Sequence, residues 1–420
     1  MSTPPTTTDP TMAIPADRQD ERFLADEGLA GWVKGSISRL RSGDLGSLPV
    51  VIGLILIWGV FFVLNDAFLS SRNLVNLTLQ MVPTGTIAIG VVLVLLLGEI
   101  DLSVGSVSGL SGAVLAVGFV NHGWTSGMAV GLALLVGVAI GVIYGLLFNR
   151  YGVPSFVITL AGLLAVLGLQ IKVLGKDGTI NLAFTSDIVQ FASQKFVPDA
   201  VAYALVLLAV GAAFLAKLAQ GRRRAAAGLS AVPPSVVLVR TGLLGLILLL
   251  AVYILGRDRG VSYMVLTFIA LVVLTDLLVR RTRWGRSVMA VGGNVEAARR
   301  AGINVKRIYL TVFALSSFFA ALGGIFAAAR LASVSQSSGG ADTNLNAIAA
   351  AVIGGTSLFG GRGSAYSALL GILVIQSISN GLGLLSLDTS YRFMVTGGVL
   401  LLAVIIDSLS RRSRAAHGRA

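Results

Sequence analysis

The chain contains no cysteine and only two histidines, His122 and His417. Without cysteine it can form neither disulfides nor thiolate metal sites, and two isolated histidines make no cluster of metal ligands. We therefore expect no metal site. Charged residues are also scarce, at 12% of the 420 residues.

Apolar residues take the place of the missing charges. They make up 55% of the chain, and the mean hydropathy is +0.87. No soluble protein of this length would tolerate such a composition on its surface, so the sequence predicts a polytopic membrane protein. The 51 glycines agree with this class, because helices that pack closely in lipid rely on small residues.

Apolar runs of spanning length recur along the chain. They lie near residues 49–64, 74–97, 103–121, 127–148, 154–174, 200–216, 236–255, 261–279, 309–329, 364–384 and 392–408. A shorter, alanine-rich run at 345–358 ends in glycines. The chain crosses the membrane twelve times if this run spans it, and eleven times if the run is re-entrant.

The basic residues distinguish between these two counts. With twelve crossings and a cytoplasmic N terminus, 24 of the 32 lysines and arginines face the cytoplasm, as the positive-inside rule requires. Eleven crossings would place the C-terminal arginines outside. We therefore expect an all-α polytopic membrane protein with about twelve transmembrane helices and both termini in the cytoplasm. This distribution also explains the net charge of +13 without a nucleic-acid partner.

Three regions follow from these runs. Residues 1–47 are polar, lack the pattern of a cleaved signal and are expected to form a flexible cytoplasmic tail. Residues 48–410 form the transmembrane domain, and residues 411–420 a cytoplasmic C-terminal tail.

Two carboxylates, Glu99 and Asp101, lie in the otherwise apolar stretch Gly98–Ser106. An acidic side chain at mid-bilayer costs roughly 2.5 to 3.5 kcal/mol, so this stretch predicts a break in a helix, a polar pathway, or both. Asp101 could cap the next helix by accepting the amide hydrogen of Ser103 or Val104, or it could contact a polar substrate. The two roles can coexist.

A second interruption follows the run Ile348–Val352, where glycines from Gly354 onward precede another helix. Two interrupted helices at corresponding places point to the pathway of a transporter. The candidate pathway residues are Glu99, Asp101, Ser103, Thr356 and Ser357.

The longest inner loop, residues 280–308, predicts a short exposed helix. Asn294 is a good N-cap, the residues from Glu296 to Ala301 favour helix, and Gly302 is a good stop. From composition alone, this helix would be a basic segment lying on anionic lipid.

Three motifs resemble one known family. The sequence Glu296-Ala297-Ala298, with Gly302 six residues after the glutamate, resembles the loop through which permeases of ATP-binding-cassette (ABC) importers dock on their ATPase. Gly98–Ser106 is similar to a stretch of the ribose/xylose-type sugar permeases, and so is Ala347–Leu358 followed by Gly360-Gly361. Together with Gly292-Gly293-Asn294, these motifs cover the chain from about residue 50 to 410.

The resemblance implies a permease subunit that translocates a monosaccharide across the bacterial inner membrane, with xylose as the leading substrate. It implies a ten-helix core, to which residues 200–255 add a further pair. The coupling residues would be Asn294, Glu296, Ala297, Ala298 and Gly302. The implied partners are an ATPase subunit, an extracytoplasmic sugar-binding protein, a second permease copy and membrane lipid.

Energy would come from ATP and magnesium on the partner ATPase, and the permease itself would bind no cofactor and be no enzyme. The sequence has no Gly-x-x-x-x-Gly-Lys-Ser/Thr motif, since Asp177 follows its one Gly-Lys pair, Gly175-Lys176. The alternatives are an ion-coupled secondary sugar transporter and an ABC permease for another sugar or a nucleoside.

Overall fold

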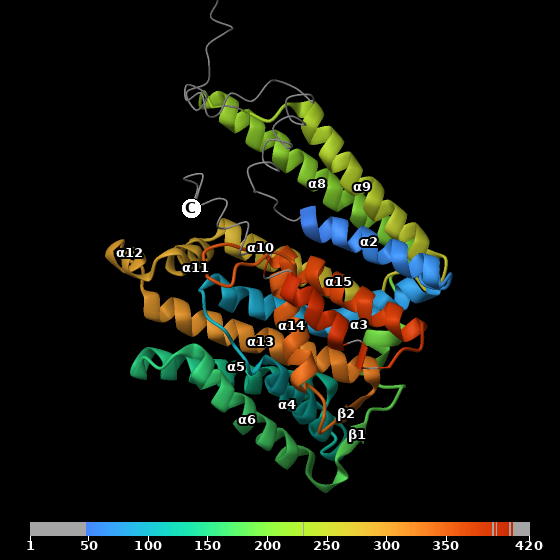
Figure 1. Ribbon diagram of the computed structural model, residues 1–420, viewed down its shortest axis with the longest axis vertical. Coiled ribbons are helices and arrows are strands. Elements are labelled where there is room, and N and C mark those ends of the chain that lie inside the picture. The colour runs from blue at the N-terminus through green and yellow to red at the C-terminus, as the bar shows by residue number, and fades with distance from the viewer. Residues whose placement is uncertain (1–47, 230, 389, 392, 403–404, 406–420) are drawn as a thin grey trace, which may run out of the picture. The chain divides into compact units, whose positions relative to one another are not determined.

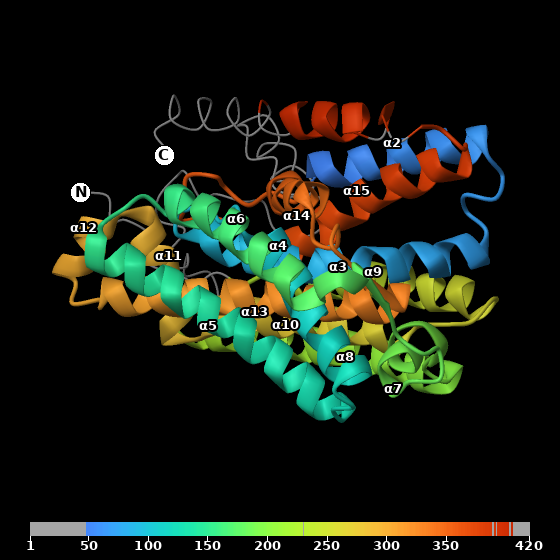
Figure 2. The ribbon, with the colours of Figure 1, turned by 90° about the horizontal axis from the view of Figure 1, so that it is seen from below.

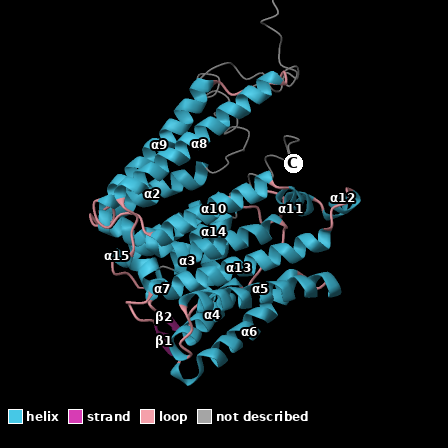
Figure 3. Cartoon of the chain, turned by 180° about the vertical axis from the view of Figure 1, so that it is seen from behind, coloured by secondary structure: helices cyan, strands magenta, loops and turns pink. Residues whose placement is uncertain are grey.

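The computed structural model describes residues 48–229, 231–388, 390–391, 393–402 and 405, and these residues are almost entirely helical (Figures 1 and 3). The predicted tails, 1–47 and 411–420, lie outside the described residues. The chain divides into two compact units. One contains Pro198–Ile254, and the other contains the remaining described segments before and after it.

The larger unit contains eleven α-helices of six residues or more, counted among the described residues up to 388. They are α2 (Leu48–Leu64), α3 (Ser71–Leu96), α4 (Val104–Ala116), α5 (Ser126–Tyr151), α6 (Ser155–Leu174), α10 (Tyr263–Arg281), α11 (Arg283–Gly293), α12 (Val295–Arg300), α13 (Val305–Leu331), α14 (Ala341–Ile353) and α15 (Ala365–Leu384). Shorter elements are the π-helical continuation of α4 (Val117–Asn121), a 3-10 turn (Gly175–Asp177), β1 (Thr179–Asn181), α7 (Asp187–Val189), a π turn (Gln190–Gln194) and β2 (Ser333–Ser335). In Figure 2, α11 and α12 lie at one end of this unit and α7 at the other.

Helix α3 is the centre of the larger unit. It begins after Ser70, whose hydroxyl accepts a hydrogen bond from the Asn73 amide, and nearly all of its residues are buried. Helices α10, α13, α14 and α15 pack around it. This coverage places α3 in the core of the unit rather than against lipid.

Glycines bring α5 and α13 into close contact. Gly137, Gly141 and Gly145 recur every fourth residue of α5 and lie directly against α13. A methyl group at Gly141 would overlap the Phe313 carbonyl oxygen. Small residues at this spacing let two helix backbones approach in lipid, where no hydrophobic force drives helices together.

One end of the larger unit is fixed by a two-stranded sheet. Strands β1 and β2 are antiparallel, with Thr179 opposite Ser335 and Asn181 opposite Ser333. The fully buried Gln170 side chain of α6 donates hydrogen bonds to the carbonyl oxygens of Ser335 and Ser338, at 3.1 and 2.9 Å. The chain that leaves β2 is therefore held against α6.

The smaller unit contains α8 (Asp199–Ala226) and α9 (Pro234–Gly256). The side chain of Val210 in α8 lies at Gly245 in α9. Only one described residue of α8, Ala202, is buried. A long helix with so many exposed apolar side chains is suited to a lipid environment.

Nine helices in the described part of the chain are long and apolar enough to cross a membrane, and each coincides with a predicted run. The three other predicted runs correspond to shorter helices: α2, α14 and Phe393–Leu402. The last of these runs, 392–408, extends beyond the described residues.

The helix formed by the alanine-rich run begins and ends earlier than predicted. Helix α14 spans 341–353 rather than 345–358, because it begins directly after Gly340 and ends at Gly354. At 13 residues, it is shorter than the roughly 20 needed to cross a bilayer.

Candidate functional site

The chain is non-helical between α3 and α4, where the first interruption was predicted. Helix α3 ends in a Schellman motif, in which the amides of Gly98 and Glu99 donate to the carbonyl oxygens of Leu95 and Val94. Gly98 has a φ of +78°, a left-handed conformation that glycine adopts without steric cost. The helix is thus stopped by Gly98.

Asp101 accepts the predicted hydrogen bond from Ser103, but it lies two residues before α4, whose N-cap residue is Ser103 and has no side-chain cap of its own. Asp101 Oδ1 accepts hydrogen bonds from the backbone amide of Ser103, at 2.9 Å, and from the Ser103 hydroxyl, at 2.7 Å. The Asp101 side chain is buried, and its Oδ2 has no hydrogen-bond partner among the described residues. The hydroxyls of Ser316 and Tyr144 lie beside this Asp101–Ser103 pair. Asp101 therefore fixes the backbone just before α4 through Ser103, within a buried polar cluster.

Hydroxyl groups of α6 hold the rest of this segment. The Ser155 hydroxyl donates to Glu99 Oε2 at 2.6 Å, and the backbone amide of Leu102 donates to Thr159 Oγ1 at 3.1 Å. Glu99 is only partly buried. Its carboxylate thus has a hydrogen-bond donor at an otherwise apolar helix end, which lowers the cost of placing a charge there.

The second interruption, residues 354–364 between α14 and α15, lies directly against the first. Thr356 and Ser357 are buried in it. The amide of Gly361 donates to the carbonyl oxygen of Leu96 at 2.9 Å, and Gly360 packs on Gly98. The tertiary structure therefore brings together the two segments that carry the predicted pathway residues.

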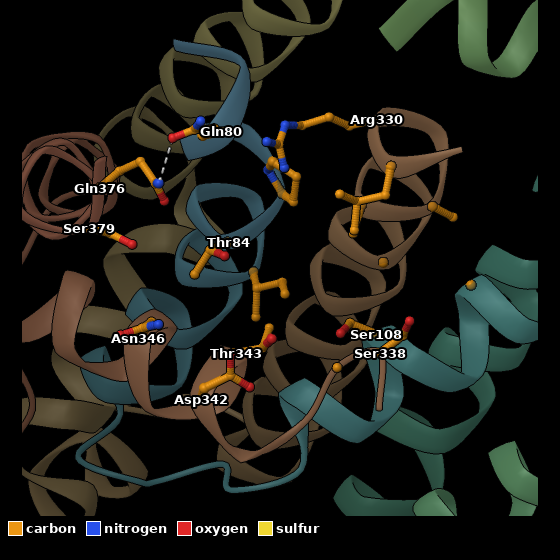
Figure 4. Close-up of a pocket in the computed structure, with 18 of the residues that line it drawn as sticks. Gln80, Thr84, Ser108, Arg330, Ser338, Asp342, Thr343, Asn346, Gln376 and Ser379 are labelled. Atoms are coloured by element: carbon orange, nitrogen blue, oxygen red, sulfur yellow. Dashed lines mark hydrogen bonds between the residues drawn. The ribbon is translucent and has the colours of Figure 1, made fainter. Parts of the chain in front are cut away.

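A polar cavity of about 620 Å³ lies toward the opposite end of α3 (Figure 4). It is lined by the N-terminal half of α3, the C-terminal parts of α13 and α15, the start of α14, and α4. None of the described residues that line it is aromatic. Its lining is rich in amide and hydroxyl groups, which can both donate and accept hydrogen bonds.

Side-chain amides join α3 to α15 along one wall of this cavity. Asn73 and Asn380 exchange two hydrogen bonds, at 2.8 and 3.1 Å. The amide nitrogen of Gln376 donates to Gln80 Oε1 at 3.0 Å, drawn as a dashed line in Figure 4, and Asn380 reaches the same oxygen at 3.3 Å. The wall is therefore polar but carries no net charge.

Two charged side chains line the cavity from different helices. Arg330 comes from α13 and Asp342 from α14, and Figure 4 shows them at opposite ends of the cavity. Within the part of the chain that the structure describes, neither forms an ion pair or a side-chain hydrogen bond. The guanidinium group of Arg330 and the carboxylate of Asp342 are thus available to bind a polar ligand in the cavity.

The five predicted pathway residues do not line this cavity, and the cavity residues were not predicted. A signal for them exists in the sequence. Asn73, Asn76, Gln80 and Thr84 are spaced three or four residues apart within one apolar run, so that they form a single polar stripe on a helix.

The predicted coupling helix forms as α12. Asn294 Oδ1 accepts a hydrogen bond from the Ala297 amide at 2.9 Å, and Gly302, with a φ of +80°, follows the helix end. The side chains of Asn294, Glu296 and Ala297 are exposed, and Ala298 is buried. Glu296 forms an ion pair with Arg299 at 2.6 Å.

Comparison with known proteins identifies the family. A family model described as "Branched-chain amino acid transport system / permease component" matches residues 73–404. The chain belongs to this permease family. The xylose transport system permease protein of Escherichia coli is 38% identical to it over 386 residues, which cover 91% of this chain and 97% of the relative.

Other relatives of this permease are named for different sugars. The ribose import permease protein of Bacillus subtilis is 32% identical, with 87% of this chain and 94% of the relative covered. The L-arabinose ABC transporter permease protein of Azospirillum brasilense is 30% identical, with 83% and 84% covered. No solved structure matches this chain.

These findings confirm the family that the three motifs indicated. The protein is a multi-pass protein of the bacterial inner membrane, and its relatives are transporters rather than enzymes. An ABC permease is favoured over an ion-coupled secondary transporter.

Substitutions of Asp101 test the role of its hydrogen bond with the Ser103 amide. We expect Asp101→Asn to retain most of the folded protein, because asparagine keeps an oxygen that accepts from the Ser103 amide. Asp101→Leu leaves that amide unpaired in a buried site, at a cost of about 1 to 3 kcal/mol. Thermal unfolding in detergent measures the difference. Equal destabilisation by both substitutions would contradict a role for this hydrogen bond alone and indicate that the charge is required.

Proposed function

We propose that this chain is the transmembrane subunit of an ABC importer that carries xylose into the cytoplasm. One observation carries the proposal: the chain aligns over 91% of its length with a xylose permease. The cavity in its membrane domain, lined by amides and hydroxyls, supports it. A neutral sugar needs such paired donors and acceptors. Its many hydroxyls would otherwise lose their hydrogen bonds to water.

The proposed topology has twelve crossings, with both termini in the cytoplasm. One of these crossings is a broken span, made of the short helix α14 and the non-helical residues 354–364 that follow it. In this arrangement α3 runs inward, so that the cavity lies in the outer half of the membrane and α12 lies on the cytoplasmic side. The proposed core has ten helices, to which α8 and α9 add a further pair. Exposed apolar side chains along α8 support a position in lipid.

Sugar would enter the cavity from outside and leave past the two interrupted segments. In the present arrangement the way inward is closed where Gly98 and Leu96 meet Gly360 and Gly361. Opening must separate these segments, and the polar side chains of Asp101, Ser103, Thr356 and Ser357, with Glu99 at the inner end, would then face the passing sugar. This sequence of events assigns the cavity to the outward-open state.

The energy and the cargo would come from partners. A separate ATPase subunit would bind ATP and magnesium and dock on α12, through Asn294, Glu296, Ala297, Ala298 and Gly302. An extracytoplasmic binding protein would deliver the sugar, and a second copy of this chain would complete the transporter. The chain itself would hold no cofactor.

Uptake of labelled xylose into proteoliposomes tests the function. With the permease and ATPase in the bilayer, we expect uptake to require both enclosed magnesium-ATP and external loaded binding protein, and to be unaffected by a proton uncoupler. Uptake that continues without ATP and stops on addition of the uncoupler would instead establish a secondary transporter.

The amide wall of the cavity gives a second test. Gln80→Leu removes a group that can donate to and accept from the sugar, and one such hydrogen bond contributes about 1 kcal/mol. We expect transport turnover at saturating loaded binding protein to fall about 5- to 10-fold. Thr78→Val is the control, because Thr78 lies on the same helix outside the cavity and bonds only the Val75 carbonyl. Unchanged turnover in Gln80→Leu would exclude this wall from the pathway.

The role of α12 is tested by reversing one charge. We expect Glu296→Lys to leave the protein folded in the membrane, since the side chain is exposed, and to reduce ATP hydrolysis stimulated by loaded binding protein to its basal level. Arg299→Gln is the matched control, because it removes the same ion pair without reversing the charge at position 296. Wild-type stimulation in Glu296→Lys would leave α12 as a helix that only contacts lipid.

A further inference from the structure

Three glycine motifs far apart in the sequence meet at one point of the larger unit. They are Gly98 after α3, Gly292 near the end of α11, and Gly360-Gly361 between α14 and α15. We call this meeting point the glycine junction. It is made of backbone against backbone.

Gly292 is the most crowded member of the junction. A methyl group on its α-carbon would overlap the Leu96 carbonyl oxygen and come within 2.8 Å of the Gly361 nitrogen. That oxygen and that nitrogen are the two atoms joined by the 2.9 Å hydrogen bond between the interrupted segments. Gly292 thus packs directly against the Leu96–Gly361 hydrogen bond, which closes the proposed pathway toward the cytoplasm.

The neighbouring glycine behaves differently. A methyl group at Gly293 would meet no atom within 4 Å. The two adjacent glycines therefore differ in their surroundings, although both terminate the same helix. A side chain is therefore excluded at position 292 by its close neighbours and not by the end of the helix, which both glycines share.

We propose that Gly292 is a positioning residue for transport, which passes the movement of α12 to both interrupted helices at once; this inference rests on the proposed docking of the ATPase on α12. Only Gly293 and Asn294 separate Gly292 from α12. The Asn294 amide also donates to the carbonyl oxygen of Ala290 in α11, so the short link between the two helices is held by a hydrogen bond. A displacement of α12 moves Gly292 against Leu96 and Gly361. Because no side chain lies between these backbones, no rotamer change can absorb the displacement.

The competing route runs through α13, which follows α12 directly. This helix packs along α3, α4 and α5 and could move them without the junction. The two routes differ in one respect, since only the first depends on the space at Gly292. Substitutions at positions 292 and 293 therefore separate them.

The test uses Gly292→Ala and Gly293→Ala in the complete transporter with its ATPase and binding protein in proteoliposomes. We expect Gly293→Ala to match the wild type. We expect Gly292→Ala to retain at least half of the stimulated ATP hydrolysis while sugar uptake per ATP falls at least 10-fold. Uptake per ATP in Gly292→Ala equal to that in Gly293→Ala would overturn the proposal and favour the route through α13.

A conformational readout accompanies this measurement. The chain has no cysteine, so Ile100→Cys provides a single reporter in the first interrupted segment, where Ile100 is 37% exposed. We expect its rate of maleimide labelling to change at least threefold on addition of ATP and vanadate in the wild type and in Gly293→Ala, and to stay constant in Gly292→Ala. A change of the wild-type size in Gly292→Ala would also overturn the proposal.

If Gly292→Ala does not fold, the unaltered junction remains testable. Gly293→Cys and Ile100→Cys, each in an otherwise wild-type chain, should change their labelling at the same ATP concentration. If labelling of the two cysteines changed at different ATP concentrations, the direct coupling of position 293 to the first interrupted segment would be contradicted. Failure of the proposed function is distinguishable, because it would appear as absent ATP-driven uptake in the wild type itself.

Discussion

The requirement that every backbone amide and carbonyl group find a partner inside the protein governs the rest of this structure. Within a membrane, no water is present to satisfy such groups, so a helix can be interrupted only where other residues replace its lost hydrogen bonds. In the first interruption, Asp101, Ser155 and Thr159 supply these partners. In the second, the Ser357 amide donates to the Arg362 carbonyl oxygen, and the Gly361 amide donates to the carbonyl oxygen of Leu96, the last residue of α3 before the first interruption. Each interrupted segment is therefore satisfied partly by the other.

This mutual satisfaction explains why the two interruptions can act as a closure. Their contact is a short backbone hydrogen bond reinforced by glycine packing, and separating them costs only a few interactions. The buried cluster around Asp101 lies beside them, with polar atoms that have no partner among the described residues. Such groups are costly in the closed arrangement and would be satisfied by a passing polyhydroxylated molecule.

The chemistry of the cavity fits a molecule that must be released as well as bound. Sugar sites that hold their ligand tightly commonly combine hydrogen bonds with contact to aromatic rings, and the described lining of this cavity has no aromatic ring. Amides that already bond one another, such as Gln80 and Gln376, can exchange these bonds for sugar hydroxyls at little net gain. Weak binding along a pathway favours passage.

The sequence by itself determined the class of the protein, most of its helices, the hydrogen bond from Ser103 to Asp101, the short helix after Asn294 and the family. These features depend on local patterns: apolar runs, caps and short motifs. Only the tertiary structure decided that Gly98, Gly292 and Gly360 meet, and that the amides of α3 and α15 face one cavity. Such placements depend on how helices far apart in the chain pack together. For that reason the acidic residues are conspicuous in the sequence and the polar stripe of α3 can be found there, whereas the cavity that this stripe lines exists only once α3, α13 and α15 are assembled.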